Sequence, residues 1–118
     1  MITKTTVPLG IVQAQLDAYN SKKIDDLLTC YDKDAELYAL HGALLATGHA
    51  EIRQRFEARF LEPDLHARLI HRSVVGNVVI DHEMVTRNFP QGKGEVEMLC
   101  IYEINDGRIC KATFFTKN

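Results

Sequence analysis

The segment from Glu95 to Thr116 reads EVEMLCIYEINDGRICKATFFT, two largely apolar runs on either side of Asn105-Asp106-Gly107. Apolar residues alternate with polar ones in much of both runs, as they do in strands with one buried face. A connection this short joins antiparallel neighbours, because a parallel crossover needs a dozen residues or more. The segment therefore predicts a β-hairpin.

Two registers are open to this hairpin. A three-residue loop with Gly107 at positive φ pairs Ile104 with Arg108 and places Cys100 and Cys110 on the same face, about 7 Å apart. A two-residue Asp106-Gly107 turn would instead put Cys110 on the opposite face from Cys100. We favour the three-residue loop.

Two further strands are predicted upstream of the hairpin. They run from Leu65 to Val75 and from Val78 to Phe89, separated by Gly76-Asn77, and a loop over 90–94 connects them to the hairpin. Short connectors on all sides predict a four-stranded antiparallel meander.

The first half of the chain is predicted to be mainly helical. Apolar residues recur at three- and four-residue steps after Thr6, after Ser21-Lys22-Lys23 and after Gly48. These patterns predict a helix capped by Thr6 and ending near Asn20, a shorter helix carrying Ile24 to Tyr31, and a third from about His49 to Leu61. A short strand is expected over Ala35–Leu40, and residues 42–48 are expected to form a loop.

Together these elements predict an α+β fold in one domain, residues 1–118. Its sheet is a cone-shaped curved antiparallel one, with four long strands plus a short one, wrapped around three N-terminal helices. Three modest helices are too small to fill the concave side of strands this long. A cavity is therefore expected near the helix ends.

Composition and charge exclude several classes of function. Fourteen basic and sixteen acidic residues are interspersed and give a net charge of −2, so no nucleic-acid surface is indicated. No apolar run approaches the ~20 residues needed to span a bilayer. The three cysteines have no paired spacing, which favours reduced thiols and a cytoplasmic location, and neither a metal nor another cofactor is expected.

Motifs along nearly the whole chain resemble a known superfamily. They include Tyr19-Asn20, Gly76-Asn77, the 79–83 run VIDHE and the 102–109 run YEINDGRI. The sequence is similar to the SnoaL-like branch of the nuclear transport factor 2-like superfamily, which also contains ketosteroid isomerases. The resemblance implies the cone-shaped fold, but this scaffold serves isomerases, cyclases, dehydratases and non-catalytic binding modules alike.

The resemblance also argues against standard ketosteroid isomerase chemistry. That family is expected to carry a tyrosine on the first helix, an aspartate base on the first strand and a protonated aspartate on the third long strand. The aligned positions here hold Gln15, Ala39 and Cys100. The base and both acids of that mechanism are therefore missing.

The same alignment assigns the residues that face the cavity. His82 and His41 are the expected catalytic residues, because histidine exchanges protons near neutral pH; a hydrogen-bonded structural role is the alternative. On this assignment Asp81 and Glu83 point to the opposite face. The expected ligand contacts are Gln15, Tyr19, Ala39, Phe56, Phe60, His71, Met84, Met98, Cys100, Tyr102 and Phe114.

The sequence thus predicts a pocket for a small apolar or aromatic molecule, with acid–base chemistry of the isomerase, cyclase or dehydratase type as a possible addition. The alternative is a non-catalytic, dimeric ligand-binding or protein-interaction module. Leu99 and Ile101, between Glu97 and Glu103, form an apolar stripe on the outer face that suggests a homodimer through the sheet.

Overall fold

The computed structural model describes residues 3–117, with side chains described from Val7 onward. Three helices precede most of the sheet in chain order: α1 (Thr3–Asn20), α2 (Ile24–Thr29) and α3 (Gly48–Phe60). The strands are β1 (Tyr31–Ala39), β2 (Leu44–Thr47), β3 (His66–Val75), β4 (Val78–Phe89), β5 (Gly92–Asn105) and β6 (Arg108–Lys117). No helix within this range is both long and apolar enough to cross a membrane.

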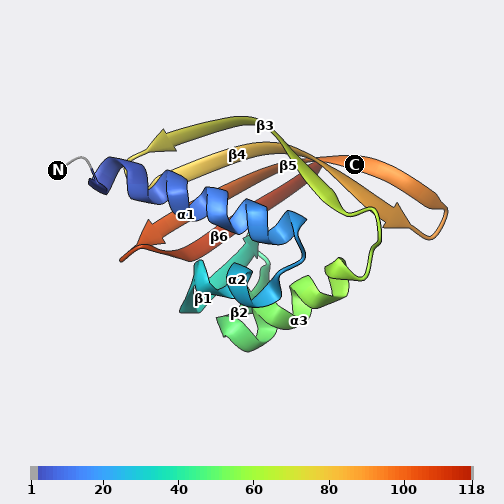
Figure 1. The fold of residues 1–118 in the computed structure, drawn as a ribbon, viewed down its shortest axis with the longest axis horizontal. Helices are drawn as coiled ribbons and strands as arrows, with labels where there is room; N and C mark the ends of the chain where they lie inside the picture. Colours follow the sequence, from blue (N-terminus) through green and yellow to red (C-terminus); the bar gives the residue numbers. More distant parts are fainter. Residues whose placement is uncertain (1–2, 118) are drawn as a thin grey trace.

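One curved sheet of six strands, in the order β2-β1-β6-β5-β4-β3, arches over the helices (Figure 1). Strands β3 to β6 form the predicted antiparallel meander. The sheet is open, and α1 lies along its concave side against β3, β4 and β6, while α3 packs on β1 and β2. The predicted α+β cone is thus confirmed.

The first strand is longer than predicted, and it pairs in parallel with β6 where an antiparallel sheet was predicted. Helix α2 ends at Thr29, so Tyr31 begins β1 instead of closing the helix, and its side chain is fully buried. The backbone N–H of Ile109 donates to the Cys30 oxygen at 2.8 Å, and β1 then runs parallel to β6. Residues 44–47, expected in a loop, form β2 beside β1. These pairings are tertiary, so helical periodicity around Tyr31 could not reveal them.

The carboxy-terminal hairpin adopts the turn that we did not favour. Asp106 (φ 52°) and Gly107 (φ 73°) form a two-residue turn, and Asn105 lies opposite Arg108. Primed turns of this kind match the twist of the flanking strands, which explains why the shorter loop forms. A bulge then shifts the pairing by one residue, so that Tyr102 lies opposite Ala112, and Cys100 opposite Phe114.

Cys110 is the extra residue of a bulge in β6, because Glu103 pairs with Lys111 while Ile104 pairs with Ile109. The Cys110 thiol donates to the Glu103 backbone oxygen at 3.3 Å. All three cysteines are free thiols, as predicted; Cys30 and Cys100 are buried, but Cys110 is only half-buried.

The core lies between the helices and the concave face of the sheet. Fully buried side chains from α1, α2 and α3 meet those of β1, β4 and β6; they include Val12, Leu27, Tyr31, Leu37, Ile52, Val79 and Ile109. A second, smaller cluster sits toward the β3 end of the sheet and comprises Leu16, Leu65, Ala67 and Val85. The candidate site lies where these two clusters meet.

Candidate acid–base site in the cone

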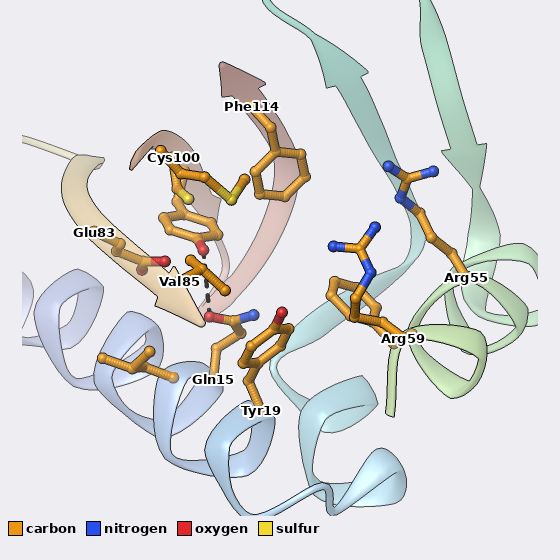
Figure 2. A pocket seen from close by; sticks show the side chains of 12 residues that line it. Gln15, Tyr19, Arg55, Arg59, Glu83, Val85, Cys100 and Phe114 are labelled. Atoms are coloured by element: carbon orange, nitrogen blue, oxygen red, sulfur yellow. Dashed lines mark hydrogen bonds between the residues drawn. The ribbon is translucent and has the colours of Figure 1, made fainter. Parts of the chain in front are cut away.

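A cavity of about 60 Å³ opens between α1, α3 and the concave face of β4, β5 and β6 (Figure 2). Helix α1 contributes Gln15, Leu16 and Tyr19; helix α3 contributes Arg55, Phe56 and Arg59; and the sheet contributes Glu83, Val85, Met98, Cys100, Tyr102 and Phe114. The lining is mainly apolar with a few polar groups. Small-molecule sites commonly have this composition.

Aromatic rings form much of the wall. Tyr19 meets Phe56 edge to face with ring centroids 5.9 Å apart, and Tyr102 meets Phe114 in the same way at 6.3 Å. Edge-to-face pairs of this kind are favourable beyond the area they bury. Contacts between rings thus hold much of the wall together.

Glu83 is the exceptional residue of the cavity. Its side chain comes from β4, and the residue is only 5% exposed. Burial is the main cause that raises the pKa of the Glu83 carboxyl to about 7, and the negative charge of Asp81 is the second. A hydrogen bond with the Cys100 thiol and the positive charge of Arg72 partly oppose this rise. At neutral pH this carboxyl is therefore present in both its protonated and its ionised form.

Asp81 lies two residues earlier on the same face of β4. It is fully buried, and both of its carboxylate oxygens accept hydrogen bonds. Arg72 on β3 donates to both of its carboxylate oxygens, from Nε at 2.6 Å and from Nη2 at 2.9 Å. The third contact of Arg72, from Nη1 to Gln13 Oε1 at 2.7 Å, ties this ion pair to α1. A bidentate pair of this kind provides charge-assisted hydrogen bonds to both oxygens of the buried carboxyl.

Hydroxyl and amide groups complete the polar part of the cavity. The Tyr102 hydroxyl donates to Gln15 Oε1 at 3.4 Å (dashed in Figure 2). Burial raises the pKa of Tyr19 to about 12, so its hydroxyl stays protonated at neutral pH. Gln15, Tyr19 and Tyr102 thus offer neutral hydrogen-bonding groups to a ligand oxygen.

Many of the residues predicted to face the cavity do so. Seven of them line it: Gln15, Tyr19, Phe56, Met98, Cys100, Tyr102 and Phe114. Phe60 lies one layer behind, edge-on to Tyr19 at 5.7 Å. Ala39, the last residue of β1, lies opposite Phe114 in the sheet but does not line the cavity.

The cavity face predicted for β4 is wrong, and so is the predicted placement of His82 and Met84. His82 lies opposite Leu99, which is 37% exposed, and its Nε2 is 2.6 Å from Glu97 Oε2 on the outer face. Met84 lies opposite Glu97 on the same face. The two-residue turn at Pro90-Gln91 sets this register, whereas we expected a longer loop; a shift of one residue exchanges the two faces of a strand.

His71 and His41, the other two histidines predicted to face the cavity, also lie away from it. Ile70 forms a bulge in β3, because Leu69 pairs with Glu83 while His71 pairs with His82. His71 is consequently exposed, beside Ser73, and His41 is exposed in the turn after β1. The structure therefore gives no geometric support to acid–base chemistry by these histidines in the cavity.

The sequence-based assignment missed Glu83, Arg55 and Arg59. One signal for Glu83 was present: Val79, Asp81, Glu83 and Val85 alternate as regularly as Val78, Ile80, His82 and Met84, so either set could face inward. The alignment to the family placed the set with His82 inward, and therefore the set with two carboxylates outward. The charge of Arg72 offsets the cost of turning these carboxylates inward. Arg72 lies on β3, and the bulge at Ile70 sets its position opposite Asp81, so the strand's own sequence does not reveal the pair.

The sequence matches one family model, described as a SnoaL-like domain, over residues 12–112. None of the curated proteins matches it.

Solved structures with the same fold include three from bacteria. A nuclear transport factor 2-like protein of unknown function from Burkholderia pseudomallei has a TM-score of 0.83 at 10% identity, covering 94% of this chain and 91% of that one. A protein from Jannaschia described as a SnoaL-like polyketide cyclase has a TM-score of 0.84 at 15% identity, covering 97% and 88%. A protein with a ketosteroid isomerase-like fold from Catenulispora acidiphila, in complex with trimethylamine, has a TM-score of 0.77 at 16% identity, covering 89% and 83%. At these identities the likeness concerns the fold.

Proposed function

Because the chain belongs to the family of SnoaL-like domains, we propose that it binds a small apolar or aromatic molecule in the cone and transfers a proton within it through Glu83. The reaction class is an isomerisation, a cyclisation or a dehydration that begins at a carbon next to a carbonyl. The Jannaschia relative described as a cyclase is compatible with this class.

One observation supports the proposal above the others: a carboxyl with a pKa of about 7 lies in the wall of an apolar cavity. A general base is most effective when its pKa is near the working pH, because both of its protonation states are then available. Perturbed carboxyls of this kind are concentrated at functional sites.

The proton transfer can be written with the residues present. The Glu83 carboxylate takes a proton from the carbon next to the ligand's carbonyl, and the electrons of that C–H bond move onto the carbonyl oxygen. Gln15 already accepts from Tyr102 through Oε1, so its amide nitrogen can donate to the developing oxyanion. In an isomerisation, protonated Glu83 then returns the proton to a different carbon. In a cyclisation, the enolate carbon bonds to the carbon of a second carbonyl group of the ligand, whose π electrons move to its oxygen, and Glu83 gives its proton to that oxygen. In a dehydration, the enolate expels a β-hydroxyl group, which leaves as water with the proton of Glu83.

Exchange of deuterium into a simple ketone tests this step without knowledge of the natural substrate. The protein is incubated with 2-tetralone in D₂O near pD 7, and loss of the α-proton signals is followed by NMR. The wild type should accelerate exchange over buffer, and Glu83→Gln should abolish the acceleration. Glu97→Gln, on the outer face, is the matched control and should exchange at the wild-type rate.

If Glu83→Gln is as active as the wild type, Glu83 is not the base. If the ketone binds without accelerated exchange, the pocket serves binding alone.

A second candidate function is a non-catalytic dimeric module, and the outer face of the sheet favours it. Leu99 on β5 and Phe115 on β6 lie opposite each other there and are 37% and 42% exposed. An exposed apolar row on a sheet is typical of protein–protein contacts. This candidate predicts a dimer whose assembly does not depend on the cavity.

A further inference from the structure

Two arginines at the cavity bear on the chemistry of the ligand. Arg55 and Arg59 are four residues apart on α3, so they project from the same face of the helix, and both line the cavity. Both also line a shallow depression over α3 beside Leu45, so they separate the cavity from solvent.

Few acidic groups contact these two arginines, so most of their positive charge is not paired within the protein. Within residues 7–117, Arg55 has no salt bridge or side-chain hydrogen bond, and burial, followed by the nearby positive charge of Arg59, lowers its pKa. Arg59 approaches Glu62 only at 3.7 Å. Glu62 is already held by Arg87 through two hydrogen bonds of 2.7 and 2.8 Å.

A third arginine on the same helix shows the usual arrangement. Arg53 contacts Asp25 at 2.6 Å and Glu57 at 3.5 Å, so its charge is paired on the surface. Arg53 is thus paired, whereas the two arginines that line the cavity are poorly paired; of these, Arg55 is exposed and Arg59 is half-buried.

The acidic and basic groups of the cavity lie at opposite sides. Figure 2 shows Glu83 on β4 at one side and the two arginines on α3 at the other, with Gln15 and Tyr19 between them. Neither arginine is among the groups that shift the Glu83 pKa. Glu83 thus does not neutralise the arginines, and both remain available to a ligand.

We propose that the ligand of this cavity is an amphipathic anion, whose apolar or aromatic body lies between Tyr19, Phe56 and Phe114 and whose carboxylate is bound by Arg55 and Arg59. This inference rests on the proposed function and narrows its substrate class. Guanidinium groups bind carboxylates through charge-assisted, often bidentate, hydrogen bonds. When Arg55 and Arg59 hold the carboxylate at their side of the cavity, the other end of the ligand points toward Glu83.

Matched pairs of arylalkanoates and their amides test the proposal. Phenylacetate, 3-phenylpropionate and 2-naphthylacetate are each titrated against the corresponding neutral amide by isothermal calorimetry or by chemical-shift perturbation, at low ionic strength. The acid of the best pair should bind roughly tenfold tighter than its amide, since a charge-assisted contact has about that effect. Arg55→Gln and Arg59→Gln should each remove most of the preference, whereas Arg53→Gln should retain it.

The outcomes separate this inference from the proposed function. Equal affinity for acids and amides overturns the anion assignment and leaves the apolar pocket and Glu83 in place. A preference for acids that survives in Arg55→Gln and Arg59→Gln also overturns it. If no member of any pair binds, both the anion assignment and the proposed pocket fail. Thermal unfolding of each variant verifies that it is folded.

Discussion

Glu83 on β4 lies opposite Met98 on β5, and this pairing turns the carboxyl toward the cavity instead of toward water. Residues directly opposite in an antiparallel pair share a face of the sheet, so an inward Met98 requires an inward Glu83. Burial and the charge of Asp81 then raise the Glu83 pKa to about 7. Two of the predictions below depend on this relationship.

The stability of the protein should depend on the ionisation of Glu83. The folded-state pKa of about 7 lies above the ordinary value of 4.5, so the folded state holds the proton more tightly than the unfolded state. Its contribution is present below pH 4.5 and is lost as the pH rises toward and through 7, by on the order of 3 kcal/mol in all.

Glu83→Gln removes this pH-dependent loss. The free energy of unfolding of the variant, measured with urea between pH 5 and pH 8, should therefore rise relative to the wild type as the pH increases. Glu95→Gln, at an exposed position of β5, serves as the control. Parallel curves for Glu83→Gln and the wild type would show that the Glu83 pKa is not raised.

Removing one member of the buried pair of Arg72 and Asp81 should lower the stability of the protein strongly. Arg72→Leu leaves the fully buried Asp81 carboxylate without its partner, and such a loss typically destabilises by about 3–5 kcal/mol. Urea unfolding measures the effect. Arg68→Leu, exposed on the same strand, should change stability by about 0.5 kcal/mol or less.

Replacing both members of this pair provides a further comparison. The double variant Arg72→Leu/Asp81→Leu has no unpaired buried charge and should recover a large part of the loss. If the double variant is less stable than Arg72→Leu by the full cost of a second independent change, the two side chains do not act as a pair.

His82 should be dispensable for proton transfer in the cavity. Its ring contacts Glu97 on the outer face of the sheet, away from Glu83. His82→Gln should therefore exchange α-protons of 2-tetralone at the wild-type rate, with only a small change in melting temperature. A loss of exchange in a variant that remains folded would restore this histidine as a catalytic candidate.

The outer face of the sheet leads us to propose a homodimer. Leu99 and Phe115 stand exposed in neighbouring strands, so a second copy of the chain could bury both. Gel filtration with light scattering should give twice the monomer mass of 13.4 kDa for the wild type. Leu99→Lys should give the monomer, and Val75→Lys, which alters an exposed apolar residue at the end of β3, should remain dimeric. A monomeric wild type at micromolar concentration would contradict the proposal.

Much of the fold followed from local pattern. The predicted bounds of β4, Val78 to Phe89, agree with the structure, and those of α3 and β6 agree to within one residue. These segments combine a clear period with Gly, Pro or Asn at their ends, and both signals are local in sequence. The cavity residues on α1, β5 and the end of β6 were instead assigned from the family resemblance together with the alternation of the strands.

The tertiary structure alone decided which face of β4 became the inner one and, with it, which side chain carries the candidate chemistry. Both alternating sets of that strand contain apolar residues, so periodicity could not choose between them. The tight turn at Pro90-Gln91, the bulge at Ile70 and the ion pair from Arg72 to Asp81 made the choice. Each of these joins residues on different strands. The sequence by itself therefore determined most of the elements and the cone, while pairing between strands determined β1 and β2 and the fact that Glu83 faces the cavity and His82 does not.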